Sequence, residues 1–373
     1  AGAARRVYDT LASDTSLPIP LRKAAGMGRI SASGTGAGPL LLDLLRGSDP
    51  DMQEAAIARI ADVFTPEAIA PVCALVPGLP ETAQVQVLAV LAGYPADRVL
   101  PTVLQAARSG AVPVRIGAIK ALESTGGPSV VPFLAEAAAG ARGPEQAAAR
   151  SALGMLKGRA VDEAVVTLLG QKVSEEVAGE LLLTVADRRI FPAKGIVAAS
   201  LTSPSPRIRV QALKALRAIG TPSDIPAVLD LLLKTDDESE RGEAEKTTAA
   251  LAQTMASPDG RSRSVKTRLA TEKDPGSRVR LINILPLIGD SSALPILRTT
   301  LEDTNPDVFD AAVRALVAWP TSAAHDDIRR LARDSRNETH RLLAIRGLVR
   351  SVGLDTYRNP DAAVADLKLA AGF

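Results

Sequence analysis

The sequence contains few of the residues on which many enzyme and metal sites depend. Aromatic residues make up 2% of the chain, and there are only one cysteine and two histidines. A single cysteine excludes an internal disulfide framework and a cysteine-rich zinc site. The shortage of aromatic side chains favours closely packed helices over a pocket walled by rings.

An excess of charge of one sign is also lacking. The chain has 44 lysines and arginines against 42 acidic residues, which leaves a formal charge of +2. This balance is too small to argue by itself for a nucleic-acid partner or an acidic membrane. Charge therefore has to be examined region by region.

Long apolar runs are absent as well. No window approaches the roughly 20 consecutive apolar residues of a membrane-spanning helix, so we expect no membrane span. Residues 1–12 lack the apolar core of a signal peptide. Residues 3–12 and 360–373 each have the pattern of a helix without a polar closing repeat, so we expect both ends to continue in a longer chain. The cysteine count leaves cytoplasm and periplasm both open.

What the sequence has in abundance is an internal repeat. The segment PRIRVQALKAL places Ile208, Ala212, Ala215 and Leu216 on one face of a helix, with small residues where a neighbouring helix can approach. A chain of 373 residues exceeds the size of one compact core, and a repeat array avoids that limit. The last, large aliphatic position of this pattern recurs 29 to 36 residues apart, at Ile30, Ile60, Leu91, Leu122, Leu153, Val185, Leu216, Leu251, Leu287, Leu316 and Leu348.

Most of these helices have a recognisable start. Proline is tolerated in the first helical turn, where its missing N–H needs no partner. Ser174 is a candidate N-cap for the helix that lacks a proline. The prolines that occupy or adjoin the other first turns are Pro50, Pro80, Pro113, Pro144, Pro206, Pro275 and Pro306.

A second, shorter kind of helix lies between them and carries a proline inside an apolar stretch. Examples are APVCALV at 70–76, VPFLAEAA at 131–138 and IPAVLDLLL at 225–233. Because TPEAIAPVCAL indicates a helix that begins at Thr65, we expect Pro71 to lie past the first turn and to bend the helix. A bent first helix paired with a straight second helix is the predicted unit.

This pattern resembles HEAT repeats of the bilin-lyase type. The likeness is carried by the proline of the first helix and by an Asp or Ser six positions before an Arg in the second. It implies an all-α protein, a right-handed α-α superhelix of about eleven hairpins in one solenoid over residues 1–373. It also implies a ladder of capping and inter-repeat contacts. The repeats at 144–157 and 174–189 depart from this pattern, because they lack the arginine. The ladder pairs are Ser109 with Arg115, Ser203 with Arg209, Asp274 with Arg280, and Ser335 with Arg341.

Residues 238–353 are also similar to the HEAT region of very large exported bacterial proteins. In those proteins the array is joined to other modules, such as a c-type haem domain. No Cys-x-x-Cys-His motif occurs here. The resemblance implies an exported or periplasmic protein that belongs to a larger multidomain chain or complex; without it, the chain is expected in the cytoplasm.

Candidate reactive residues are few, and none predicts catalysis. We expect His325 to be exposed at a helix start beside two aspartates, and His340 to occupy the apolar packing position of its repeat. Cys73 lies among aliphatic residues and is expected to be buried and inert. The glycine-rich stretch at 31–38 lacks the Lys-Ser/Thr of a phosphate loop and is interpreted as a turn. We therefore predict no catalytic residue, no metal ligand and no cofactor.

One region, 234–280, departs from the repeat length and changes the sign of its charge. An acidic segment that includes Asp236, Asp237 and Glu238 is followed by a basic one. One interpretation is a solvated loop with compensating charges. The other is a partner-docking segment, because insertions in solenoids fall in loops, often on a binding face. The candidate basic docking residues are Arg261, Arg263, Lys266 and Arg268.

The leading functional hypothesis is a non-catalytic scaffold that binds proteins on an extended concave surface, usually formed in this family by the second helices. The alternative is a nucleic-acid-binding protein similar to HEAT-like DNA glycosylases, which grip the duplex backbone with basic residues. The near-zero net charge and the single tryptophan, Trp319, count against it. A bilin lyase or isomerase is a third hypothesis, which rests on family likeness alone.

Overall fold

A computed structural model describes residues 2–354 and 359–372 of the chain. Within these residues the secondary structure consists of helices and turns, without a strand. Contacts divide the chain into two compact units, residues 1–188 and 189–373. Each unit is described by itself below, and the prediction of one solenoid over residues 1–373 stays a prediction.

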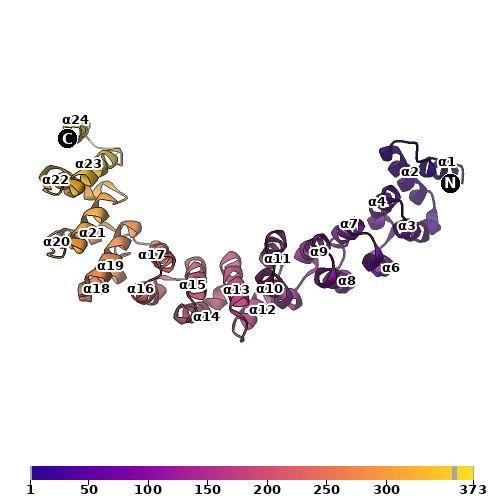
Figure 1. Ribbon diagram of the computed structural model, residues 1–373, viewed down its shortest axis with the longest axis horizontal. Helices are drawn as coiled ribbons and strands as arrows, with labels where there is room; N and C mark the ends of the chain where they lie inside the picture. The colour runs from indigo at the N-terminus through magenta and orange to yellow at the C-terminus, as the bar shows by residue number, and fades with distance from the viewer. Residues whose placement is uncertain (1, 355–358, 373) are drawn as a thin grey trace. The chain divides into compact units, whose positions relative to one another are not determined.

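Helices alternate along each unit in pairs of a first and a second helix (Figure 1). In unit 1 the first helices are α1 (Gly2–Ser13), α3 (Ala37–Arg46), α6 (Ala70–Leu75), α8 (Ala96–Ser109), α10 (Val131–Gly140) and α12 (Arg159–Leu169). Their second helices are α2 (Ile19–Ser31), α4 (Pro50–Ile57), α7 (Glu81–Leu91), α9 (Val112–Thr125), α11 (Pro144–Met155) and α13 (Glu175–Arg188). The four-residue helix α5 (Ile60–Val63) follows α4.

Unit 2 repeats the same alternation. Its first helices are α14 (Lys194–Ala199), α16 (Ile225–Lys234), α18 (Arg263–Thr271), α20 (Leu294–Thr300) and α22 (His325–Asp334). Its second helices are α15 (Pro206–Ile219), α17 (Glu238–Gln253), α19 (Pro275–Ile288), α21 (Pro306–Val317) and α23 (Glu338–Gly353), and α24 (Pro360–Ala371) comes last. The described residues therefore form eleven helical pairs, which confirms the predicted all-α fold of the α-α superhelix class.

Consecutive second helices pack on one another and form a row. In unit 2 this row runs from α15 through α17, α19 and α21 to α23. In unit 1 it runs from α2 through α4, α7, α9 and α11 to α13. Within each unit taken alone, the second helices line the inner side of its curve and the first helices the outer side (Figure 1). Side chains that project from the second helices therefore determine what the inner side can bind.

The predicted apolar stripe forms the core between the rows. Ala212, Ala215 and Leu216 are fully buried, and most equivalent positions are buried as well. The prediction is wrong at Leu287, which is 46% exposed, while Leu285 is fully buried in its place. The predicted register of this helix, which takes Arg280 as the equivalent of Arg209, is two residues too far along the chain. With Leu285 in the series, the neighbouring repeats span 34 and 31 residues.

Most of the prolines singled out in the sequence begin a helix, in both kinds of helix, although Pro101 lies inside α8. Pro206, Pro275 and Pro306 lie in the first turn of α15, α19 and α21, as predicted. The predicted bend at Pro71 is wrong, because α6 begins at Ala70 and a separate three-residue 3-10 turn, η2 (Pro66–Ala68), precedes it. The same arrangement precedes α10, α16 and α20, with the turns η4 (Pro128–Val130), η7 (Pro222–Asp224) and η8 (Ser291–Ala293). A proline favours a new helix start over a bend, since it cannot donate the hydrogen bond that would continue the turn.

No helix among the described residues is both long and apolar enough to cross a membrane.

Candidate protein-binding surface

Arginines near the start of second helices join neighbouring repeats. Arg115 donates from Nε and Nη2 to the Glu145 carboxylate at 2.7 and 2.8 Å, and from Nη1 to the Gly110 carbonyl at 3.0 Å. Arg209 pairs in the same bidentate way with Glu240 and donates to the Ser203 carbonyl at 2.8 Å. Each guanidinium thus caps the end of its own first helix and holds the next second helix, and bidentate charged bonds are among the stronger ones.

Asp274 and Arg280 have separate tasks. Asp274 is the N-cap of α19 and accepts from the Ser277 amide at 2.8 Å. Arg280 reaches the preceding repeat instead, where Nη1 donates to the carbonyls of Leu232, Leu233 and Thr235 at 3.0, 3.2 and 2.9 Å. Those carbonyls end α16, so Arg280 supplies a cap across repeats.

The remaining arginines of the ladder region are Arg278, Arg341 and Arg150. Arg278, and not Arg280, occupies the helix position of Arg209, and it pairs with Asp303 at 2.6 Å. Arg341 lies in the first turn of α23, and its ladder role stays a prediction. The repeats that lack the arginine are nevertheless connected, because Arg150 of α11 donates to Glu180 of α13 at 2.7 and 2.6 Å.

The acidic docking candidates lie at the turn between α16 and α17. Asp237 caps α17 by accepting from the Glu240 amide at 2.7 Å. The Asp236 side chain is fully exposed and lies 3.5 Å from Arg280. Glu238 is exposed in the first turn of α17. Two of the three therefore have a structural contact, and Glu238 projects into solvent.

The basic docking candidates lie in the loop before α18 and along α18. Three of them hold structural contacts. Arg261 donates to the Met255 carbonyl at 3.0 Å, Lys266 to Ser292 Oγ at 2.8 Å, and Arg268 to Asp230 at 2.8 Å. Arg263 is exposed.

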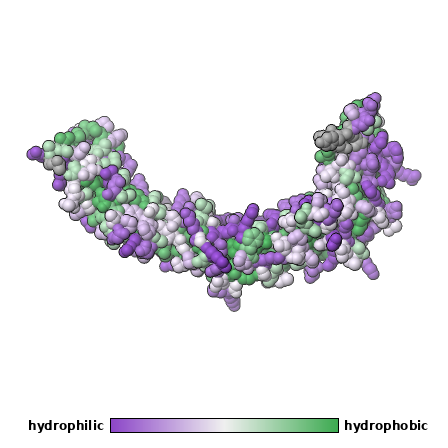
Figure 2. Space-filling view, turned by 180° about the vertical axis from the view of Figure 1, so that it is seen from behind, coloured by the Kyte–Doolittle hydropathy of each residue, from purple (hydrophilic) through white to green (hydrophobic). Residues whose placement is uncertain are grey.

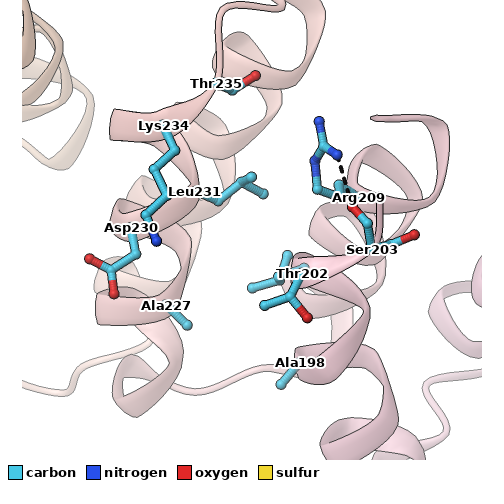
Figure 3. A pocket seen from close by; sticks show the side chains of 10 residues that line it. Ala198, Thr202, Ser203, Arg209, Ala227, Asp230, Leu231, Lys234 and Thr235 are labelled. Carbon is cyan, nitrogen blue, oxygen red and sulfur yellow. Dashed lines mark hydrogen bonds between the residues drawn. The ribbon is translucent and has the colours of Figure 1, made fainter. Parts of the chain in front are cut away.

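Two grooves lie on the outer side of unit 2, one on each side of α16. The first, of about 510 Å³, lies between α14 and α16. Figure 3 shows its polar rim, with Asp230 and Lys234 on one wall and Arg209, hydrogen-bonded to Ser203, on the other. The second, of about 370 Å³, lies between α16 and α18 and is lined in part by Arg263, Thr267 and Arg268.

A third hollow lies on the inner row of unit 2 and spans three consecutive second helices. It measures about 510 Å³. Seven of the ten residues that line it are charged or polar, unlike the apolar packing between the rows. The residues that line it are Arg241 and Glu245 of α17; Gly276, Val279, Arg280 and Asn283 of α19; and Asp307, Asp310, Ala311 and Arg314 of α21. We name this feature the inner hollow.

Three segments, residues 74–154, 160–249 and 263–349, match the sequence profile of HEAT repeats, and together they cover well over half of the chain. The chain belongs to the HEAT-repeat family.

Solved structures agree with this HEAT assignment at the level of the fold. The karyopherin Kap121p bound to the extreme C-terminus of the protein phosphatase Cdc14p aligns with 93% of this chain and 46% of its own, at 11% identity and a TM-score of 0.57. Kap121p alone aligns with 99% of this chain and 49% of its own, at 11% identity and a TM-score of 0.56. The HEAT chain thus spans about half the length of these structures. No curated protein matches its sequence.

The two histidines of the HEAT chain are both buried. The expected exposure of His325 is wrong, because it is 4% exposed, with Nδ1 2.8 Å from Ser351 Oγ and Nε2 3.1 Å from Asp366 Oδ2. These contacts join α22 to α23 and α24. Ser351 is 1% exposed, so its hydroxyl is closed to a substrate. His340 is buried at its packing position, as predicted, and its Nε2 lies 2.9 Å from Asp310.

Cys73 is buried, as predicted, and burial raises the pKa of its thiol, which keeps it protonated near neutral pH. Within residues 2–354 and 359–372, no group of three or more His, Cys, Asp or Glu side chains is placed to hold a metal ion.

Three arginines of α22, on the outer side of unit 2, are paired with acids close by. Figure 2 shows hydrophilic side chains gathered at the C-terminal end of this unit, where α22 lies. There Arg329, Arg330 and Arg333 have half or more of their side chains exposed, and they pair with Asp366, Asp327 and Asp334 at 2.9, 2.7 and 2.7 Å. Neutralised cations of this kind make a poor surface for a phosphate backbone.

The sequence did not predict the inner hollow. Glu245 and Asp310 each stand six residues before the stripe position of their helix, and in the corrected register Val279 of α19 takes the same place. The two-residue register error at Leu287 hid this alignment. The signal that could have identified it is the recurrence of charge on solvent-facing positions of three consecutive second helices.

Proposed function

We propose that this chain is a non-catalytic scaffold that binds a protein segment on the inner row of second helices in unit 2. The observation that carries the proposal is the inner hollow, whose lining comes from three consecutive second helices. HEAT and karyopherin-type solenoids are typically protein-interaction scaffolds, which supports the general class. A hollow lined largely by charged and polar residues provides directional contacts for an extended segment.

The outer groove beside α18 is a second place on the same scaffold at which a partner can dock. Arg263 is the docking candidate best suited to a test there, because it is exposed, whereas Arg261, Lys266 and Arg268 brace the repeat. Neutralising all four basic candidates would break hydrogen bonds that stabilise the repeat as well as remove charge. The bilin-lyase type of the repeats and the exported, multidomain context remain proposals drawn from sequence likeness.

Site-specific photo-crosslinking tests the proposed binding face. A photoreactive amino acid is placed at Asn283 in the inner hollow, and in a matched variant at Thr267 on the outer groove. Both side chains are exposed, so neither replacement disturbs the core. After irradiation in extract of the source cells, we expect a discrete protein adduct at Asn283 that mass spectrometry identifies.

The pattern of adducts decides between the alternatives. Adducts confined to Thr267 would move the binding face to the outer side. Adducts with DNA or RNA at either position, together with salt-sensitive retardation of duplex DNA by the unmodified chain, would replace the scaffold by a nucleic-acid-binding function.

A further inference from the structure

Each arginine of the inner hollow has at least one hydrogen-bond partner, although the buried Nε of Arg241 has none in the part of the chain that the structure describes. Arg280 donates to three carbonyls at the end of α16. Arg241 Nη2 donates to the Asp236 carbonyl at 3.3 Å, and Arg314 Nε donates to Asp310 at 2.6 Å. Each arginine is therefore held by its own repeat or by a neighbour, and its charge is partly satisfied within the protein.

Two carboxylates of the same hollow are not satisfied in this way. Among the described residues, no hydrogen bond or ion pair involves the side chain of Glu245 or Asp307. Glu245 is half-buried in α17, and burial raises the pKa of its carboxyl although Arg241 and Lys246 oppose the shift. Asp307 is exposed in the first turn of α21.

A carboxylate that is withdrawn from water without a partner costs free energy, and an added cation removes that cost. The folded-state pKa of Glu245 lies above its unfolded value, so this cost is present above the folded pKa and disappears as the pH falls toward the unfolded value. A bound cationic group would therefore gain a charged partner and would remove the free-energy cost of the ionised Glu245 carboxylate.

We propose that the inner hollow receives a lysine or arginine side chain of a protein segment that lies across α17, α19 and α21, with Glu245 and Asp307 as its carboxylate partners. This inference rests on the proposed function, since it names the chemistry of the segment that the inner row binds. Asp310 adds little attraction, because Arg314 and His340 already share it at 2.6 and 2.9 Å. Val279 and Ala311 add apolar surface to the hollow, on which the methylene groups of a lysine or arginine side chain can pack.

Two fluorescent peptides test the charge preference directly. One alternates lysine with glycine, and the other replaces each lysine with glutamate. We measure fluorescence anisotropy against the full chain and against the double variant Glu245→Gln, Asp307→Asn. The lysine peptide is expected to bind the natural chain and to bind the double variant with about tenfold lower affinity. The glutamate peptide is expected to bind neither.

A matched variant separates this site from general attraction by surface charge. Asp259→Asn and Glu302→Gln together remove the same number of charges at exposed positions outside the hollow. This control is expected to bind the lysine peptide like the natural chain. Equal weakening in both double variants, or tighter binding of the glutamate peptide, would overturn the inference.

Stability and crosslinking keep the two proposals distinguishable. Glu245→Gln is expected to raise the melting temperature near neutral pH and to have little effect near pH 4, because protonation then removes the same cost in the natural chain. If the Asn283 adduct forms and the double variant leaves its yield unchanged, the scaffold proposal is supported and the proposed preference for a cationic side chain is wrong. Should no protein adduct form at Asn283, the proposed function itself fails.

Discussion

Replacing Arg209 with methionine is expected to destabilise the region around α15 and α17 by about 3–5 kcal/mol, since breaking a buried ion pair strands its partner. Glu240 is completely buried and is held by Arg209 and the Thr235 hydroxyl. Without the guanidinium, the buried Glu240 carboxylate keeps only the Thr235 hydroxyl as a side-chain donor among the described residues. The carbonyls of Ser203 and Pro204 lose a donor as well.

Local exchange is a better measure than a single unfolding transition, because repeat proteins can open region by region. Hydrogen exchange of the α15 and α17 amides is expected to accelerate in Arg209→Met. The double variant Arg209→Met, Glu240→Gln should recover part of the loss, since no charge is then left buried. Arg263→Met is the surface control, expected to change stability by less than about 0.5 kcal/mol. Equal exchange in Arg209→Met and the control would refute the role of this pair.

Asp290→Asn is expected to cost about 2–4 kcal/mol near neutral pH, because several hydrogen bonds to one ionised carboxylate are lost or weakened. Asp290 is 2% exposed and fixes the loop before α18 against the start of α20. Its Oδ2 accepts from Gly260 N at 3.2 Å, Ser262 N at 2.9 Å and Ser262 Oγ at 2.6 Å. Its Oδ1 accepts from Ser292 N at 2.9 Å. An asparagine amide would direct its own hydrogens at some of these donors.

The effect of Asp290 should depend on pH with a definite sign. Burial alone raises the pKa of this carboxyl, but hydrogen bonds from Ser262 and Ser292 outweigh burial and lower it far below the ordinary value. The stabilisation is therefore complete above the unfolded pKa and is lost as the pH falls toward the folded one. Urea unfolding monitored near pH 7 and again near pH 3 should show a smaller difference between Asp290→Asn and the natural chain at the lower pH. A difference that is independent of pH would contradict this role.

The repeat architecture could be predicted from the sequence because a stacked array repeats the same local rules. Helix starts at Pro206 and Pro306 and the buried stripe at Ala212 and Leu216 depend on neighbours within one hairpin. Periodicity reports such local packing well. The register failed at Leu287, where Arg280 resembled a ladder residue but caps the preceding repeat.

What the sequence could not show depends on contacts between repeats. His325 has two aspartates beside it and looked exposed, yet its partners Ser351 and Asp366 come from later helices. Arg268 belongs to a basic segment that suggested docking, but its charge is matched by Asp230 in the hairpin before it. Pairing across repeats reduces the local excess of charge, and the sequence pattern alone does not show that pairing.

Hydrogen exchange of the full chain, with and without the partner that the Asn283 adduct identifies, tests the central claim most directly. The inner row of unit 2 is predicted to be the binding face, so exchange should slow in α17, α19 and α21 when the partner is bound, while α16, α18 and α20 stay unchanged. Protection confined to α16, α18 and α20, or no protection in unit 2, would contradict the claim that this HEAT chain is a scaffold that binds through its second helices.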